Sequence, residues 1–196
     1  PAEGFPVPQN IPQLLKGIAI IGVLPGICEE LMHRGILLKA YERRGSYKAV
    51  AFVAIIFGIF HFDVTNLLGP IFLGVIIGYY VVRTNSIFAG IWAHFLNNTV
   101  ATILQYIWRD EPRSDIITMS PTELFSNLSL GAICFVVTVG LILLFREATR
   151  KKARIVPPIS GVREDIRSIL SHWPVIIVLV LYFLMALVYI LSIMLM

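Results

Sequence analysis

Long apolar runs constrain this sequence more than any other feature. Residues 122–145 and 173–196 each contain enough consecutive apolar positions for a helix to cross about 30 Å of hydrocarbon, which takes roughly 20 residues. Hydrophobic residues make up 57% of the chain and charged residues 14%, which leaves too little polar surface for a soluble domain of this size. The lipid bilayer is therefore the expected solvent.

Helices are expected in that bilayer, because no ten-residue alternation of apolar and polar positions recurs and an open sheet edge cannot be satisfied in lipid. The predicted fold class is all-α: a polytopic transmembrane helical bundle forming one domain over residues 1–196. Pro25-Gly26 interrupts the first run, and helix formers then continue to Arg44, which predicts a kinked or two-part helix. The predicted spans are 11–28, 48–62, 67–82, 86–108, 122–145 and 173–196.

The distribution of Lys and Arg predicts the orientation of the chain. If each span crosses the membrane, the connections 42–48, 83–85 and 146–172 share one side and hold most of the basic residues. That side is expected to be cytoplasmic. The basic connection 146–172 either only determines topology or also contacts anionic lipid headgroups. A net charge of +4 thus requires no nucleic-acid partner.

The chain ends and the cysteines add less. The sequence begins at Pro1 rather than Met, and we expect further N-terminal spans outside this numbering. Cys28 and Cys134 lie in separate apolar segments, which indicates neither a disulfide framework nor a thiolate metal site. No organelle-retention signal is evident, so the predicted location is a cell membrane, with a prokaryotic-type plasma membrane favoured.

Ionisable residues at membrane depth are costly, and each is expected to have a partner or a task. Glu30 and Arg34 are four residues apart and share one helical face, where the arginine can neutralise that carboxylate. Glu29 lies about 100° away from Glu30 around the helix, outside this pair. It is therefore the candidate catalytic carboxylate. The alternative is that both glutamates lie in a solvated cytoplasmic helix.

Two further polar clusters lie on later spans. His61 ends an otherwise apolar stretch, and His94 and Asn98 share a face at i, i+4. Three candidate positions lie 14, 13 and 11 residues from the nearest basic residue on the cytoplasmic side: Glu29 from Arg43, His61 from Lys48 and His94 from Arg83. At about 1.5 Å per residue, these separations correspond to roughly 21, 20 and 17 Å. The three clusters are therefore expected to meet near mid-membrane.

Such a cluster contains the parts of a hydrolase that adds water to an amide. A carboxylate beside a histidine can hold and deprotonate a water, and an adjacent His and Asn can donate hydrogen bonds to a developing oxyanion. No serine or cysteine nucleophile is needed. The sequence therefore favours an intramembrane protease.

The motifs form an ordered triple: Glu-Glu-x-x-x-Arg at 29–34, Phe-x-x-x-His at 57–61 and His-x-x-x-Asn at 94–98. Over about residues 24–100 this triple resembles the CAAX protease and bacteriocin-processing enzyme (CPBP or Abi) family, which includes the type II CAAX prenyl endopeptidases. The resemblance implies a helical membrane bundle around a conical cavity. Family members cleave prenylated CAAX proteins or are linked to peptide processing and bacteriocin self-immunity.

Carried over by position, the resemblance implies a glutamate-dependent mechanism with no metal and no other cofactor. It assigns water activation to Glu29 and His61, oxyanion stabilisation to His94 and Asn98, and support of the site to Glu30 and Arg34. The expected substrate is a peptide or membrane-protein segment, prenylated or not. Oligomeric state is left open.

His33 departs from the family, which commonly has an aromatic residue before the motif arginine. It can replace that aromatic in packing, or it can complete a zinc set whose members would be Glu29, His33, His61 and His94. Two other functions are also open: an ion-coupled transporter, since buried charges also conduct protons, and a non-catalytic scaffold or immunity protein.

Overall fold

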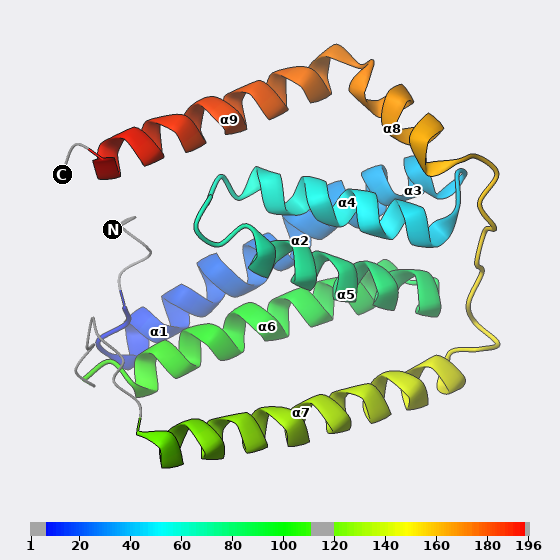
Figure 1. Ribbon diagram of the computed structural model, residues 1–196. Helices are drawn as coiled ribbons and strands as arrows, with labels where there is room; N and C mark the ends of the chain where they lie inside the picture. The colour runs from blue at the N-terminus through cyan, green and yellow to red at the C-terminus, as the bar shows by residue number, and fades with distance from the viewer. Residues whose placement is uncertain (1–6, 111–119, 195–196) are drawn as a thin grey trace.

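The first helix that the structure describes has 32 residues, Ile11–Glu42. The computed structural model describes residues 7–110 and 120–194, and every regular element within these ranges is helical (Figure 1). Most of the connection between the predicted spans 86–108 and 122–145 lies outside the described residues. The last two residues of the predicted span 173–196 also lie outside them. The all-helical fold class is thus confirmed.

The first helix is continuous, so the two-part form of the prediction is wrong. It consists of α1 (Ile11–Gly17), the π-helical segment η1 (Ile18–Val23), α2 (Leu24–Glu30), the π-helical segment η2 (Leu31–Leu37) and α3 (Leu38–Glu42). Pro25 lies at the start of α2, directly after the wider π turns. Proline cannot donate a backbone hydrogen bond, and a change of helical pitch before it lets the helix continue.

The next three helices complete a central bundle: α4 (Ser46–Phe60), α5 (Leu68–Thr84) and α6 (Ile87–Ile107). The helices α4 and α5 form a close hairpin, because glycines of α5 face α4. A Cβ on Gly74 would lie 3.0 Å from the Ala54 backbone, and a Cβ on Gly78 would lie 3.0 Å from Val50. Small residues at such an interface allow close van der Waals packing where lipid supplies no hydrophobic driving force.

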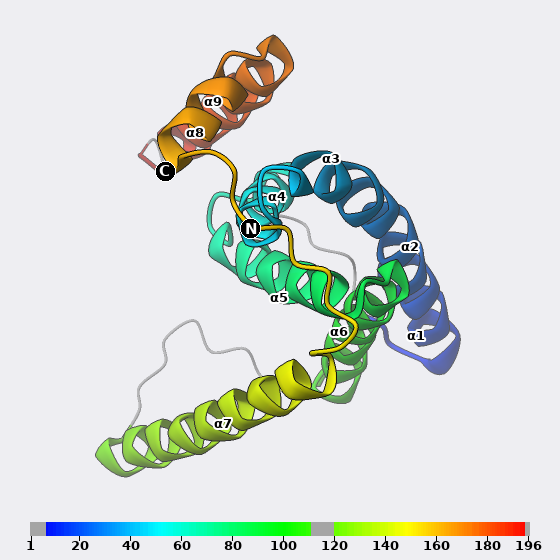
Figure 2. The same ribbon diagram turned by 90° about the vertical axis from the view of Figure 1, so that its right-hand side faces the viewer.

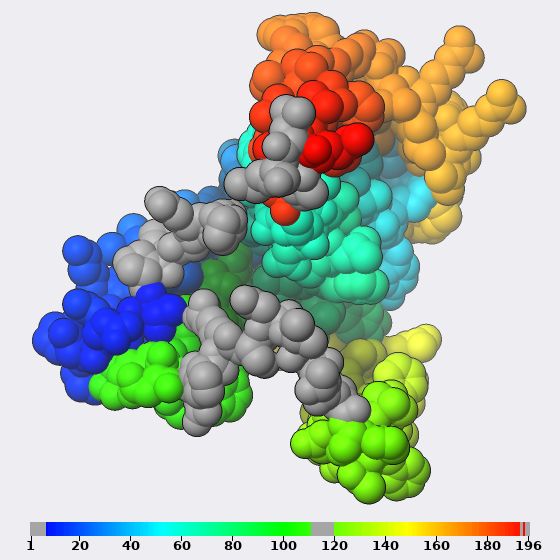
Figure 3. All heavy atoms as spheres, turned by 60° about the vertical axis from the view of Figure 1, so that its left-hand side comes forward, coloured from blue at the N-terminus to red at the C-terminus, as the bar shows by residue number. Residues whose placement is uncertain are grey.

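Two long helices flank this bundle. The helix α7 (Pro121–Ala148) lies along one side, and α9 (Trp173–Met194) lies along the other (Figures 1 and 2). The space-filling view shows α9 above α4, with α7 projecting from the lower part of the molecule (Figure 3). Both helices are apolar and expose most of their side chains, as expected of surfaces that face lipid.

Four helical segments of the described chain are long and apolar enough to cross a membrane: Ile11–Glu42, Ile87–Ile107, Pro121–Ala148 and Trp173–Ser192. Five of the six predicted spans form helices within a few residues of the expected bounds, whereas the first helix continues 14 residues past its predicted end at residue 28, to Glu42. However, α4 and α5 have only 15 and 17 residues, or about 22 and 25 Å. They are shorter than the hydrocarbon core, and their hairpin tip at His61 is expected to lie within the membrane.

The three basic connections meet at one end of the bundle, as predicted from their charge. Arg83 donates hydrogen bonds to the Thr149 hydroxyl, at 3.1 Å, and to the Arg146 carbonyl. Ser46 exchanges two hydrogen bonds with the backbone of Val156, at 3.0 and 2.9 Å. Connection 146–172 therefore lies against the turns that precede α4 and follow α5.

A short helix missing from the prediction, α8 (Val162–Leu170), follows in this connection. Its Asp165 accepts from Arg44 at 2.8 Å, from Ser160 at 2.6 Å and from Lys48. The hydrogen bonds from Lys48, Ser160 and Arg44 hold the pKa of Asp165 far below its usual range. Asp165 therefore stays ionised at neutral pH and holds α8 to the bundle.

Candidate active site

The site is built on the carboxylate of Glu30, which is fully buried at the end of α2. One oxygen, Oε1, accepts from Arg34 Nη1 at 2.8 Å and contacts His94 Nδ1 at 2.9 Å. The predicted Glu30–Arg34 pair is thus confirmed, and it also joins the first helix to α6. Since a carboxylate oxygen only accepts, His94 donates through Nδ1, and its Nε2 is left for other partners.

Arg34 connects the first helix to the α4–α5 hairpin. Its Nη2 donates to the Gly74 carbonyl at 3.0 Å, and its guanidinium lies 4.8 Å from the ring centroid of Phe57. The side chain is 1% exposed. A buried arginine with a carboxylate, a carbonyl and an aromatic face as partners is held in one position, so it fixes how the first helix sits against α5.

Phe57 is the point at which the three motifs meet. Its ring centroid lies 5.0 Å from that of His33, 4.6 Å from that of His61 and 5.7 Å from that of His94. The ring itself is fully buried. The prediction that the three clusters converge is therefore confirmed, and a phenylalanine that sequence reasoning treated only as a motif letter is their common contact.

Hydrogen bonds set the tautomers of two further histidines. His61 Nδ1 lies 2.7 Å from the Phe57 carbonyl, and His33 Nδ1 lies 2.9 Å from the Glu29 carbonyl. A carbonyl only accepts, so Nδ1 carries the proton in both rings and Nε2 presents a lone pair when the ring is neutral. His61 is exposed, whereas His33 Nε2 is buried without a partner among the described residues.

Glu29 differs from Glu30 in burial and in partners. It is half-buried, and its carboxylate makes no hydrogen bond or ion pair with any described residue. It therefore does not bond His61 directly, so a water between the two would be needed to join them. Hydrogen bonds between catalytic groups are often long or poorly aligned before substrate binds. The division between an engaged Glu30 and an unengaged Glu29 agrees with the split predicted from their helical positions.

Asn98 lies one helical turn beyond His94 on α6. Its Nδ2 donates to the Ile21 carbonyl of η1 at 2.8 Å, and its Oδ1 accepts from Asn97 at 3.1 Å. An amide nitrogen has two hydrogens, so one remains for a ligand. The catalytic roles of Glu29, His61, His94 and Asn98 stay predictions.

His33 is the residue whose role the sequence leaves open between packing and zinc binding. Within the described ranges, no group of three or more His, Cys, Asp or Glu side chains is placed to hold a metal ion. His33 instead packs edge-on against Phe57 and against Phe60, whose centroid is 6.1 Å away. This geometry agrees with the packing role considered for His33.

Tyr182 of α9 is a residue near the site that sequence reasoning missed. Its ring centroid lies 6.4 Å from that of Phe62, the residue after His61, and its hydroxyl is buried without a hydrogen-bond partner among the described residues. The only indication in the sequence was its hydroxyl group, a polar atom in an otherwise apolar span. No sequence pattern indicated which helix it would contact.

Gly90 of α6 provides a test of how tightly Glu30 is held. A Cβ there would lie 2.9 Å from Glu30 Oε2 and 2.8 Å from Val81 Cγ2. We expect Gly90→Ala to cost about 1–3 kcal/mol by overpacking, measured as a lower midpoint of thermal unfolding in detergent. Gly131→Ala is the matched control, since its Cβ would meet nothing within 4 Å. Equal midpoints for the two variants would contradict the packing described.

Comparison with known proteins agrees with this geometry. Residues 11–100 match the family model described as type II CAAX prenyl endopeptidase Rce1-like. Over 117 residues the chain is 30% identical to "Putative membrane peptidase YdiL" of Bacillus subtilis (strain 168), a match that covers 59% of this chain and 45% of that protein. The chain thus spans about half of this relative. No solved structure matches significantly. Residues 11–100, which contain every motif residue of the site, are thus similar to the CAAX protease family.

Proposed function

We propose that this protein is an intramembrane endopeptidase that hydrolyses a peptide bond of a membrane-associated substrate with water activated by Glu29 and His61. The observation that carries the proposal is the convergence of three helices on Phe57, which gathers His61 and His94 beside the Glu30–Arg34 pair. The half-buried carboxylate of Glu29, on the same helix as Glu30, makes no hydrogen bond or ion pair with any residue that the structure describes.

In the proposed reaction, a water bound between Glu29 and His61 Nε2 attacks the peptide carbonyl carbon. One of these two groups takes a proton from the water as the C–O bond forms. The resulting tetrahedral intermediate carries an oxyanion. When the C–N bond breaks, the same proton passes to the leaving nitrogen.

The oxyanion is stabilised by His94 and Asn98 in this proposal. Because His94 Nδ1 already donates to Glu30, His94 can donate from Nε2 only as an imidazolium that carries both protons. Asn98 contributes its remaining amide hydrogen.

The surroundings of His61 favour an apolar substrate. A groove between α9 and the α3–α4 region passes the preceding residue, Phe60. It is lined by Leu37, Tyr41, Ile56, Ile59, Phe60, Pro174, Val175, Val178 and Leu179. Such a lining can hold either a prenyl chain or an apolar peptide segment. A prokaryotic-type plasma membrane is the proposed location.

The proposal is tested by cleavage of quenched fluorescent peptides, including a farnesylated CAAX peptide, by purified protein in detergent with and without a zinc chelator. Cleavage that needs Glu29 and is indifferent to the chelator supports it. Loss of cleavage on addition of the chelator would indicate a metal-dependent mechanism instead. No cleavage of any peptide would favour the scaffold or transporter alternatives.

Replacement of Asn98 by Ala tests the oxyanion role. We expect turnover to fall by about 10²- to 10³-fold, the usual cost of removing one oxyanion donor. Asn97→Ala is the matched control, because Asn97 is exposed and, among the described residues, its side chain hydrogen-bonds only to Asn98. Thermal unfolding of both variants separates the loss of the bond to Ile21 from a loss of catalysis. Equal turnover in both variants would remove Asn98 from the mechanism.

A further inference from the structure

The helix α8 is held at the membrane boundary by its connection to α9. Only Ser171 and His172 separate Leu170, the end of α8, from Trp173, where the span α9 begins. Two residues extend at most about 10 Å between flanking positions. The C-terminal end of α8 therefore lies within about that distance of the point where α9 enters the lipid.

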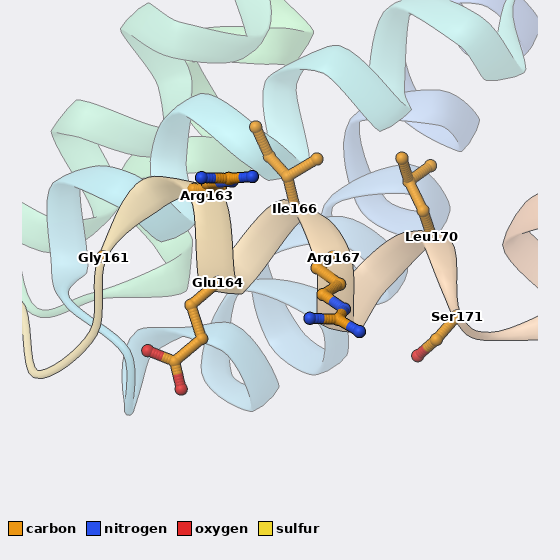
Figure 4. A pocket seen from close by; sticks show the side chains of 7 residues that line it. All are labelled: Gly161, Arg163, Glu164, Ile166, Arg167, Leu170 and Ser171. Carbon is orange, nitrogen blue, oxygen red and sulfur yellow. The ribbon is translucent and has the colours of Figure 1, made fainter.

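Around its axis, α8 divides into three strips. Asp165 and Ile169 are both 9% exposed and face the protein. The next strip is apolar and open: Val162, Ile166 and Leu170 are 63%, 51% and 48% exposed. Arg163 and Arg167 follow on the far side of this apolar strip, since each residue turns about 100°. Ile166 and Leu170 point in one direction, opposite to Glu164 and Ser171 (Figure 4).

The charge that this region presents is strongly positive. Connection 146–172 has seven Lys and Arg residues against three Asp and Glu residues. Of the three acids, Asp165 is held by Arg44 and Lys48 of the bundle, and Glu147 faces Arg150 at 3.4 Å. Several cations are exposed and pair with no described acidic side chain: Lys151, Lys152, Arg154, Arg163 and Arg167.

We propose that α8 is an amphipathic anchor that binds the anionic lipid headgroups of the leaflet in which α9 begins. An exposed apolar strip beside arginines, at the level where a span begins, matches a helix that lies in the interfacial plane. Val162, Ile166 and Leu170 would enter the acyl boundary, while Arg163 and Arg167 would bind lipid phosphates. The exposed lysines would add attraction to anionic lipid.

The test places a fluorophore on α8 in the full chain. Cys28 and Cys134 are replaced by Ala, and Ile166→Cys is labelled with an environment-sensitive dye in nanodiscs of phosphatidylcholine with or without phosphatidylglycerol. Ser171→Cys, on the opposite side of α8, is the matched label position. We expect a blue-shifted, lipid-quenched emission at position 166 in anionic nanodiscs, and a water-like emission at position 171.

The charge dependence is tested by adding Arg163→Gln and Arg167→Gln to the labelled protein. We expect this double change, or high salt, to reverse most of the blue shift. Lys16→Gln with Arg109→Gln removes the same charge from the other end of the bundle and should leave the shift intact. A label at position 166 that stays water-like, or is equally shifted without anionic lipid, would overturn the proposal. Size-exclusion profiles show whether each variant remains folded.

Discussion

Replacement of Glu29 by Gln is expected to lower turnover by about 10²- to 10⁴-fold, the usual contribution of general acid–base catalysis, with little change in stability. The reason is the contrast between the two adjacent glutamates. Glu29 is half-buried and makes no hydrogen bond or ion pair with any described side chain, so an amide of the same shape breaks no such contact. The measurements are peptide cleavage and the midpoint of thermal unfolding in detergent.

Glu30→Gln is the matched control for that prediction. It changes the same group on the next residue, but it removes the charge that Arg34 and His94 contact at 2.8 and 2.9 Å. Its unfolding midpoint should fall, whereas that of Glu29→Gln should not. A Glu29→Gln variant that cleaves as fast as the wild type would exclude Glu29 as the base.

Arg34→Met is expected to destabilise the fold by about 3–5 kcal/mol, because it leaves the buried Glu30 carboxylate with an uncompensated charge. It also removes the hydrogen bond to the Gly74 carbonyl and the contact with Phe57. For a chain of this size, we expect the unfolding midpoint to fall by about 10 °C. Unfolding followed by circular dichroism in detergent measures this change.

Two comparisons separate charge from shape. Lys39→Met removes a cation whose side chain is 53% exposed and paired with Glu42, so it should cost less than about 1 kcal/mol. Adding Glu30→Gln to Arg34→Met removes the orphaned charge and should restore part of the stability. If the double variant is less stable than Arg34→Met alone, the buried charge is not the cause.

The common depth of the three motifs could be predicted, because it depends only on helical rise along each span. Helical rise places Glu29, His61 and His94 at similar distances from the basic end, and the structure gathers two of these residues on Phe57. The i, i+4 pair of Glu30 and Arg34 was equally accessible, since both partners lie on one helix. These are local properties, and sequence spacing determines them.

Contacts that depend on how helices turn toward one another could not be predicted. Gly74 has no side chain that a sequence pattern could identify, yet its carbonyl accepts a hydrogen bond from Arg34, 40 residues away in the sequence. Tyr182 meets Phe62 because α9 lies against the hairpin tip, and hydropathy does not indicate which neighbour a span will have. The helix α8 was missed because its nine residues are too few for a membrane span and lie in connection 146–172, which was interpreted only by its charge.

The local nature of the Glu30–Arg34 pair has a consequence for the synthesis of the chain. Glu30 precedes its other partner, His94, by 64 residues, which at 5–20 residues per second takes about 3–13 s to translate. During that interval the first helix must enter the membrane with both charges. Since Arg34 lies on the same helix, it can neutralise Glu30 before α6 is synthesised. The pair therefore lowers the free-energy cost of inserting this helix into the membrane.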